Sequence, residues 1–270
     1  MAMPSEQELE EFLASALEAA ASAGIILRQY WGKLLTIEEK SHPGDLVTIA
    51  DRTAEERIIE LLHERYPHHA ILAEESGARF VSADKDGSEF TWAIDPLDGT
   101  TNYTHQFPMV CISIALLYGD RPIVCVVYNP IIGELFHATK GGGAFLDAMP
   151  MKVSTVSEIG KSLLATGFAY DRTVNVNNNL AEFSKLTLYS QGVRRMGSAA
   201  LDLAYVAAGR LDGYWETNLQ PWDVAAGILL VTEAGGQVTD YDTSPFKLYS
   251  GRILATNKAL HQPLSAALKI

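Results

Sequence analysis

The segment from residue 90 to residue 103, FTWAIDPLDGTTNY, constrains the fold of this chain more than any other part of the sequence. Its apolar and β-branched first half is typical of a buried strand, and Pro96 and Gly99 then predict the end of that strand. Asp95 and Asp98 are therefore predicted to lie on a turn where a strand ends. Pro96 fixes its own φ and restricts Asp95, so the backbone largely sets the separation of the two carboxylates. Hard divalent cations select carboxylates held in this way.

A turn that can bind an anion follows the two aspartates. Gly99 permits a close backbone approach, and Thr100 and Thr101 each offer a hydroxyl and an amide at a predicted helix start. Free amides at a helix start bind phosphate, and a hydroxyl can orient a water molecule. The competing interpretation is that Asp98 and Gly99 form an ordinary hairpin turn, the commonest use of that dipeptide. A hairpin would not require Asp95 and two threonines as well, so the segment indicates a metal-assisted phosphate site.

The eight residues 95–102, DPLDGTTN, resemble the central signature of the inositol monophosphatase family of Mg²⁺-dependent, lithium-sensitive phosphatases. Further motifs of that family follow in the same order along the chain. Their matching residues are Lys40, residues 45–48 (DLVT), Asp51, Glu74, Gly197, Ser198, Ala199, Glu216, Trp222 and Asp223. The resemblance therefore extends over nearly the whole chain.

The resemblance implies a role for each matched residue in a metal-dependent active site. The metal ligands would be the side chains of Glu74, Asp95, Asp98 and Asp223 and the carbonyl of Leu97. The catalytic residues would be Glu74, which holds the attacking water, Thr100, which orients it, Asp51, in an outer or third-metal role, and Lys40, near the metals. Phosphate would bind at Gly99, Thr100 and Thr101, and the rest of the substrate at Asp98, Gly197, Ser198, Ala199, Glu216 and Asp223.

Several of these residues also have ordinary structural uses. Asp51 and Asp223 are acids near the predicted start of a helix, where the helix dipole stabilises them without any catalytic role. Glu74 belongs to a pair of glutamates of the kind that is most often only solvated, and Ser198 is equally well an N-cap. The sequence pattern alone favours the structural use of Asp51, whereas the resemblance favours a role near the metals.

Four ionised carboxylates gathered at one site would repel one another unless cations lay between them. Two unit charges about 4 Å apart repel by roughly 4 kcal/mol at an effective dielectric of 20. The expected ligands are all oxygens, and the histidines form no HxxxH pair, so Mg²⁺ or Mn²⁺ is expected rather than Zn²⁺. We expect two or three Mg²⁺ ions per site, with Mn²⁺ as a substitute.

Our hypothesis for the reaction assigns these carboxylates to two metals. Glu74 and Asp95 would hold the metal that binds the attacking water. Asp95, Asp98 and Asp223 would hold the metal at the leaving alkoxide. The water would attack the phosphorus directly, without a phospho-enzyme.

The remaining sequence predicts helices packed on a largely antiparallel sheet in residues 1–150 and a mixed α/β layer in residues 151–270. In the first half, helices are expected at 5–31 and after Asp51, strands at 33–40, 70–73, 109–118, 121–128, 132–140 and 144–146, a hairpin turn at 141–143, and a mobile loop at 78–88. In the second half, strands at 163–166, 193–196, 213–216, 237–239 and 253–255 alternate with helices at 178–189, 198–208, 222–234 and from 257. The predicted fold class is therefore α+β, a layered α/β/α/β/α sandwich in one compact phosphatase domain over residues 1–270.

Charge and composition exclude several classes of function. The formal net charge of −12 argues against a nucleic-acid surface, which would need a basic face. Cys111 and Cys125 lie in apolar runs without CxxC spacing and are expected to be buried and unpaired. No signal segment and no apolar run of membrane-spanning length is found, so we expect a cytoplasmic protein, with an organelle left open where a transit peptide has been removed.

Together these features predict a Mg²⁺-dependent phosphomonoesterase that hydrolyses inositol monophosphate. The family also contains phosphatases for histidinol phosphate, fructose bisphosphate and nucleotide phosphates, so a histidinol-phosphate or sugar (bis)phosphate phosphatase is an alternative. Residues 197–199 and Glu216 favour inositol monophosphate, whereas Gln220 and Pro221 depart from some members and leave substrate range and lithium sensitivity open. Some bacterial relatives are regulatory partners of the transcription machinery, which gives a third interpretation. Family members are commonly dimers, and a homodimer is expected.

Overall fold

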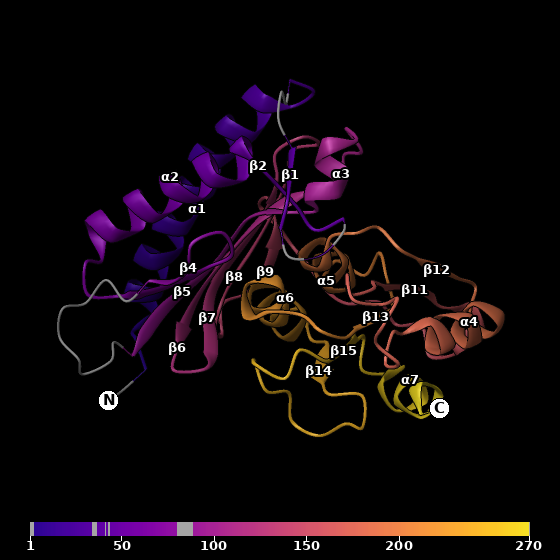
Figure 1. Ribbon diagram of the computed structural model, residues 1–270. Coiled ribbons are helices and arrows are strands. Elements are labelled where there is room, and N and C mark those ends of the chain that lie inside the picture. The colour runs from indigo at the N-terminus through magenta and orange to yellow at the C-terminus, as the bar shows by residue number, and fades with distance from the viewer. Residues whose placement is uncertain (1–2, 34–36, 41, 43, 80–88, 270) are drawn as a thin grey trace.

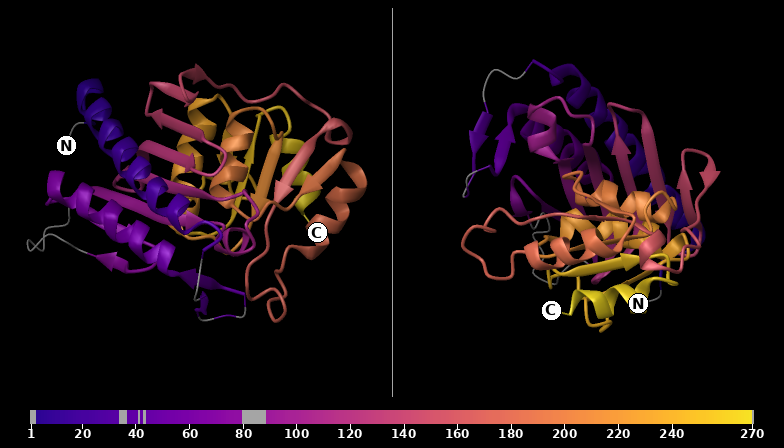
Figure 2. Two further views of the ribbon diagram at one scale, coloured as in Figure 1. Left: turned by 90° about the horizontal axis from the view of Figure 1, so that it is seen from above. Right: turned by 90° about the vertical axis from the view of Figure 1, so that its right-hand side faces the viewer.

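The computed structural model describes residues 3–33, 37–40, 42, 44–79 and 89–269, and the elements among these residues form five layers (Figure 1). Helices α1 (Glu6–Tyr30) and α2 (Ile49–Arg65) cover one face of an eight-stranded sheet. Helices α5 (Ala199–Ala207) and α6 (Pro221–Glu233) lie between this sheet and a five-stranded one. Helices α4 (Leu180–Tyr189) and α7 (His261–Leu268) cover the outer face of the smaller sheet (Figure 2). The predicted layered fold class is confirmed.

The large sheet has the strand order β10-β9-β8-β7-β6-β5-β3-β4 in the described part of the chain. Its strands are β3 (Ala70–Ala73), β4 (Gly77–Arg79), β5 (Phe90–Asp98), β6 (Cys111–Tyr118), β7 (Arg121–Asn129), β8 (Glu134–Thr139), β9 (Gly143–Leu146) and β10 (Met149–Pro150). Strands β3 and β5 pair in parallel and the other neighbours are antiparallel, as predicted. The glycines at 141–143 do form the turn of a hairpin, because Thr139 pairs with Gly143 across it.

Two predictions for the first half need correction. The loop predicted from residue 78 is wrong at its start, because the chain after β3 turns back and pairs with it as β4. Residues 80–88 of that loop lie outside the described residues. The helix predicted after Asp51 begins earlier, at Ile49, because Thr48 is its N-cap and accepts a hydrogen bond from the amide of Ala50.

The N-terminal elements otherwise follow the sequence pattern. Ser5 caps α1 through a capping box with Glu8, which fixes the predicted helix start. The strand predicted at 33–40 reduces to β1 (Ile37–Glu39), which pairs with β2 (Leu46–Thr48), while residues 34–36 lie outside the described residues. A short helix, α3 (Thr100–Thr104), follows β5.

The small sheet has the order β12-β11-β13-β15-β14 within the described ranges. Its strands are β11 (Leu163–Thr166), β12 (Gly192–Arg194), β13 (Gly213–Glu216), β14 (Gln237–Thr239) and β15 (Ile253–Thr256), preceded by a 3-10 turn, η1 (Ile159–Lys161). Strand β11 is parallel to both neighbours and the remaining pairs are antiparallel, which confirms the mixed layer. The last helix begins at His261 and not at Asn257, because Pro263 has no N–H and fits only in a first turn.

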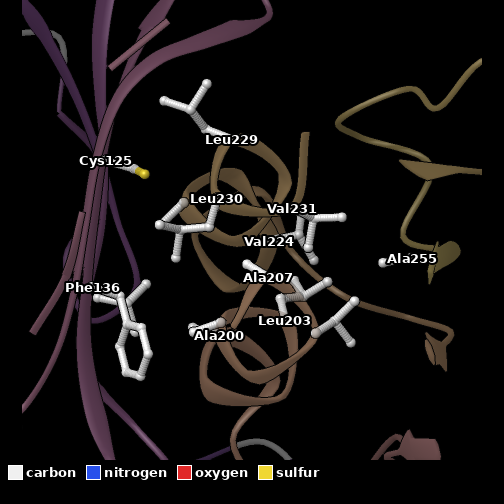
Figure 3. Packing of buried hydrophobic residues seen from close by; sticks show 14 of the residues in the cluster. Cys125, Phe136, Ala200, Leu203, Ala207, Val224, Leu229, Leu230, Val231 and Ala255 are labelled. Atoms are coloured by element: carbon white, nitrogen blue, oxygen red, sulfur yellow. The ribbon is translucent and has the colours of Figure 1, made fainter. Parts of the chain in front are cut away.

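One hydrophobic cluster joins the two sheets through α5 and α6 (Figure 3). Cys125 and Phe136 from the large sheet lie on one side of it and Ala255 from the small sheet on the other. The two helices pack closely because Gly227 of α6 has no side chain. A Cβ atom at this position would collide with Leu203 of α5. Cys111 and Cys125 are buried and free, as predicted. This shared core supports the single-domain organisation, which stays a prediction.

Candidate active site

A cavity of about 690 Å³ lies where the end of β5 meets the starts of α5 and α6. Every predicted site residue except Asp51 lines it. These lining residues are Lys40, Glu74, Asp95, Leu97, Asp98, Gly99, Thr100, Thr101, Gly197, Ser198, Ala199, Glu216 and Asp223. The fold therefore brings together side chains from distant parts of both halves of the chain.

The predicted end of β5 before the two aspartates is wrong. The strand continues through Pro96 to Asp98, and its pairing with β6 shifts register between Asp95 and Asp98. A bulge leaves one residue outside the ladder, so a proline without an N–H is tolerated there. The amide of Leu97 donates to Asp95 Oδ1 at 2.9 Å, which fixes this carboxylate against the bulge.

Asp98 connects the large sheet to the start of α5. Its Oδ2 atom accepts hydrogen bonds from Ser198 Oγ at 2.8 Å and from the amide of Ala200 at 2.7 Å. Burial raises the pKa of Asp98 to about 6, although these two hydrogen bonds act in the opposite direction. The predicted N-cap role of Ser198 is also present, because its hydroxyl accepts from the amide of Leu201. Ser198 therefore serves the helix and the cavity together.

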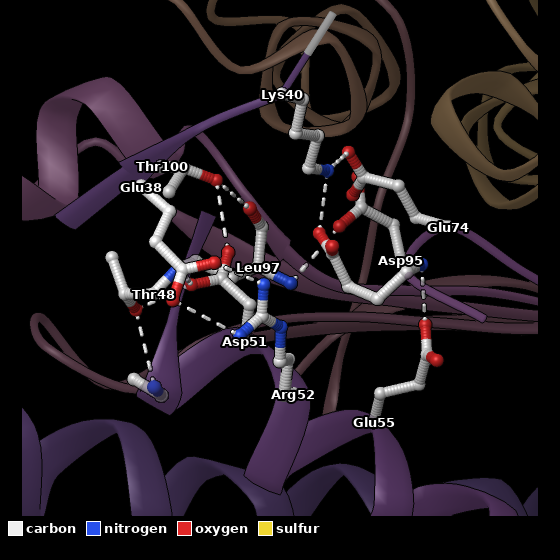
Figure 4. A network of polar contacts seen from close by, with 12 residues as sticks. Glu38, Lys40, Thr48, Asp51, Arg52, Glu55, Glu74, Asp95, Leu97 and Thr100 are labelled. Carbon is white, nitrogen blue, oxygen red and sulfur yellow. Dashed lines mark hydrogen bonds and ion pairs between the residues drawn. The ribbon is translucent and has the colours of Figure 1, made fainter. Parts of the chain in front are cut away.

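Asp51 lies behind the cavity wall and contacts it through Thr100 (Figure 4). The hydroxyl of Thr100 is 3.0 Å from Asp51 Oδ1 and 3.1 Å from the carbonyl oxygen of Leu97. Asp51 Oδ2 accepts from the amide and the hydroxyl of Thr48 at the start of α2. Burial raises the pKa of Asp51 to about 6, against the effect of the Thr48 hydrogen bond. The structural and the catalytic interpretations of Asp51 are thus compatible.

Lys40 holds the two glutamates that follow β3 (Figure 4). Its Nζ atom lies 2.9 Å from Glu74 Oε1 and 2.6 Å from Glu75 Oε1. Burial acts to lower the pKa of Lys40, but Glu74 and Glu75 together outweigh it and raise this pKa. Burial and the charge of Glu74 raise the pKa of Glu75 to about 7. The two glutamates are therefore not merely solvated, because the ammonium group of Lys40 binds both and the side chain of Glu75 is buried.

Asp223 is the third residue of α6, as the helix-start interpretation predicts. Its Oδ2 atom accepts from the amide of Gln220 at 2.7 Å, and Pro221 occupies the first helical position. Helix α6 starts at the cavity, so the same carboxylate also lines it. Burial, followed by the charges of Glu74 and Asp98, raises the pKa of Asp223 well above its usual range.

The cavity carboxylates destabilise one another in their ionised forms. Burial and then the charges of Glu74, Asp98 and Asp223 raise the pKa of Asp95 well above its usual range. A hard divalent cation fits this donor set, because it is composed only of oxygens and its negative charges need a counter-charge. Within the described ranges, no three Asp, Glu, His or Cys side chains are arranged as they would be around a bound ion.

Glu216 at the end of β13 also lines the cavity. It accepts a hydrogen bond from the buried hydroxyl of Tyr214, and burial raises its pKa to about 7 against the effect of that bond. Gly167, after β11, leaves the space that the carboxylate fills, because a Cβ there would collide with Glu216.

The cavity wall includes residues that were not predicted from the sequence. Asp202 lines the cavity one helical turn after Ser198, and this i, i+4 spacing is the signal that could have found it. Residues 167–172 after β11 also line it, and no motif marked them. Within that segment, burial raises the pKa of Tyr170 to about 12.

The layered fold and a cavity that combines clustered carboxylates with a glycine-led helix start define a class of protein, the phosphoric monoester hydrolases. The model of the inositol monophosphatase family matches residues 8–269. The chain therefore belongs to the inositol monophosphatase family, and the predicted family and enzyme class are confirmed. Members of this family are typically Mg²⁺-dependent.

Individual relatives agree with this assignment. The inositol-1-monophosphatase of Synechocystis is 54% identical over 264 residues, which are 98% of this chain and 91% of that protein. The solved structure of inositol monophosphatase from Anabaena (Nostoc) has a TM-score of 0.87 and 51% identity, and the match covers 97% of this chain and 96% of that one. The Nus factor SuhB of Pseudomonas aeruginosa is 41% identical over 265 residues, 97% of each chain. In the part of the chain that the structure describes, no helix is long and apolar enough to span a bilayer.

Proposed function

We propose that this protein hydrolyses inositol monophosphate to inositol and phosphate in a Mg²⁺-dependent reaction. The observation that carries the proposal is the one cavity that Glu74, Asp95, Asp98 and Asp223 line together with the start of α3 and Glu216. The carboxylates supply the place for cations, the helix start supplies donors for phosphate, and Glu216 supplies an acceptor for a hydroxyl group. The Synechocystis and Anabaena relatives carry the corresponding name.

The phosphate group is assigned to the start of α3. Gly99 has a φ of 98°, and a Cβ at this position would lie 2.9 Å from the carbonyl oxygen of Met109, so only glycine fits. The first bond inside α3 runs from the amide of Tyr103 to the carbonyl of Gly99. The earlier amides, at Thr100 and Thr101, have no partner within the helix and can donate to phosphate oxygens.

Thr100 is assigned to orient the attacking water. Its hydroxyl proton is directed to Asp51 Oδ1 or to the carbonyl of Leu97, so its lone pairs can accept a proton from water in the cavity. A proton accepted at Thr100 Oγ1 can pass onward to Asp51 Oδ1. With a pKa of about 6, Asp51 is ionised at neutral pH and can receive that proton.

The metal ligands are assigned to Glu74, Asp95, Asp98, Asp223 and the carbonyl of Leu97, with Lys40 holding Glu74 in position. Two or three Mg²⁺ ions, or Mn²⁺ in their place, would lower the pKa of a water molecule there and neutralise charge on the leaving oxygen. The polyol is assigned to the wall formed by Gly197, Ser198, Ala199 and Glu216.

Phosphate release from a substrate panel tests the proposal. The panel contains inositol 1-phosphate, histidinol phosphate, fructose 1,6-bisphosphate and a nucleotide monophosphate, each with and without Mg²⁺ and Li⁺. We expect the highest kcat/KM for inositol 1-phosphate, an absolute need for Mg²⁺, and inhibition by Li⁺. Asp98→Asn should abolish this release and leave the circular dichroism spectrum unchanged. Preferred turnover of another substrate would overturn the inositol assignment, and no Mg²⁺-dependent release would overturn the whole function.

A regulatory function is a second candidate, favoured by the 41% identity to the Nus factor SuhB of Pseudomonas aeruginosa. The net charge of −12 points to a protein partner and not to direct contact with nucleic acid. A pull-down from the native host with wild type and with Asp98→Asn tests it. Capture of transcription proteins by both forms would support this function, and capture by neither would contradict it.

We also propose a homodimer with a cytoplasmic location. Leu188 and Tyr189 on α4 and Val176 before it are strongly exposed apolar side chains, as expected of a surface that pairs with a second copy. The two buried free cysteines suit a reducing compartment. Sedimentation of wild type and Leu188→Glu would test the dimer, and cell fractionation would test the location.

A further inference from the structure

Asp202 is a buried carboxylate in the cavity wall for which the proposed function has no use so far. The residue is 1% exposed, and it lines the cavity from the second turn of α5. Its Oδ1 atom is buried and has no hydrogen-bond partner among the described residues. Arg195 lines the same cavity, but no ion pair joins it to Asp202 in the part of the chain that the structure describes.

A comparison with a nearby aspartate shows that this arrangement is not general in this fold. Asp212 follows α5 and is 6% exposed, and the protein satisfies both of its oxygens. Ser154 Oγ donates to Asp212 Oδ1, and the amide of Leu163 donates to Oδ2. Buried polar groups are nearly always bonded in this way, so an unpartnered buried acceptor in a residue that lines a cavity indicates a partner outside the chain.

The position of Asp202 identifies the chemistry of that partner. Ser198 and Asp202 are four residues apart and lie on the same face of α5, and the amide of Asp202 bonds to the carbonyl of Ser198. Asp98 fixes the start of this helix through Ser198 and Ala200. Among the charged groups that act on Asp202, Glu216 has the largest effect, and both carboxyl groups line the cavity. A neutral hydroxyl group can donate to such a pair without adding negative charge.

We propose that Asp202 is a further substrate-binding residue, which accepts a hydrogen bond from a ring hydroxyl of the polyol and so selects polyol phosphates over phosphate esters lacking that hydroxyl. The inference rests on the proposed function and adds one residue to its substrate site. A site built to bond a hydroxyl rejects the analogue that lacks it, because the buried acceptor then stays unpaired.

The test measures kcat/KM for inositol 1-phosphate and for each of its monodeoxy analogues, with wild type, Asp202→Leu and Asp202→Asn. We expect wild type to discriminate against the analogue that lacks the hydroxyl facing Asp202 by on the order of 100-fold. In Asp202→Leu this discrimination should fall to within about threefold for that one analogue and persist for the others. Asp202→Asn keeps an acceptor oxygen and should therefore retain part of the discrimination against that analogue.

Thermal unfolding separates a binding role from a structural one. Removing an unpartnered buried carboxylate should leave the Tm of Asp202→Leu equal to or above that of wild type. The matched control, Asp212→Asn, loses protein hydrogen bonds and should lower the Tm without changing any substrate preference. Two results would overturn the inference and leave the proposed function standing. One is unchanged discrimination between substrates in Asp202→Leu. The other is a lower Tm of Asp202→Leu together with an equal loss of kcat/KM for all analogues. A wild type without phosphate release from any inositol phosphate would overturn both.

Discussion

Gly167 lies so close to Glu216 that a Cβ atom at residue 167 would overlap the carboxylate group of Glu216. Glu216 ends β13, Gly167 directly follows the neighbouring parallel strand β11, and both residues line the cavity. Tyr214 supports Glu216 from the side through its hydroxyl group. The position of this carboxylate therefore depends on the absence of a side chain directly after the adjacent strand.

Gly167→Ala should displace Glu216 and weaken substrate use. We expect kcat/KM for inositol 1-phosphate to fall on the order of 10- to 100-fold, because displacement of a binding group by about 1 Å is enough for such a loss. Steady-state phosphate release measures it. Gly160→Ala is the matched control, since a Cβ there would lie 3.7 Å from the carbonyl oxygen of Tyr189, an ordinary contact. Equal kcat/KM in wild type and Gly167→Ala would contradict the assignment of Glu216.

Thr100→Val should remove the hydroxyl that connects the cavity to Asp51 while keeping the side-chain volume. We expect kcat to fall on the order of 100- to 1,000-fold, the usual contribution of a positioned proton-transfer group, with a smaller change in KM. The matched control is Thr104→Val in the same helix, where the Thr104 hydroxyl donates to the carbonyl of Thr101 at 2.8 Å. This control should change kcat by less than about threefold. A small effect of Thr100→Val would exclude the route through Asp51.

Mg²⁺ should raise the Tm of the wild type, because cations relieve the repulsion among the cavity carboxylates. At a Mg²⁺ concentration of 100 times Kd the gain in the free energy of unfolding is about 2.7 kcal/mol. Differential scanning calorimetry with Mg²⁺ and with EDTA measures it. Asp95→Asn should reduce the Mg²⁺-dependent shift, whereas Asp120→Asn, in the exposed turn between β6 and β7, should retain it. An identical Tm with Mg²⁺ and EDTA would argue against the metal site.

His69 should make the stability of the protein depend on pH. Its ring stacks between Tyr66 and Phe90, and burial, together with the nearby His68, lowers its pKa to about 4. The unfolded chain takes up this proton near pH 6.5, so between pH 6.5 and 4 the unfolded state binds more protons than the native state. The contribution of neutral His69 to stability is complete above pH 6.5 and is lost as the pH falls through that window.

Urea unfolding at pH 7, 6 and 5 measures this dependence. The free energy of unfolding should fall by at most about 1.4 kcal/mol per pH unit through this one group. His69→Phe keeps the stack and should flatten the slope, whereas replacing the exposed His105 with Gln should not alter it. A slope that is the same in His69→Phe and wild type would show that other groups cause it.

Most residues of the site could be predicted from the sequence, but part of its backbone geometry could not. The segment around Asp95 and Asp98 was identifiable because its chemistry is contained in a few consecutive residues. The continuation of β5 through Pro96 was not, because it depends on a bulge formed with β6. Asp202 was not predicted, although it lies one helical turn after the predicted Ser198 on the same face of α5.

Helix and strand types were predictable because most segments have a clear period of apolar residues. The predicted helix boundaries were wrong where the conformation of a single residue decides the start of the helix. Asn179 has a φ of 65°, so α4 begins after it at Leu180 and not at residue 178. Likewise α2 begins at Ile49, before the predicted start, because the side chain of Thr48 accepts a hydrogen bond from the amide of Ala50.

The hydrogen bonds from Ser198 and Ala200 to Asp98 also have a consequence for how such enzymes diversify. In the proposed function, the end of β5 and the start of α3 would carry most of the reactive chemistry, and residues from α5 and β13 would contact the alcohol that the phosphate leaves behind. Changes around residues 202 and 216 can therefore adapt the protein to a new alcohol while the phosphate chemistry stays intact. In contrast, a mutation that removes the hydrogen bonds from Ser198 and Ala200 to Asp98 would change the turnover of every substrate at once.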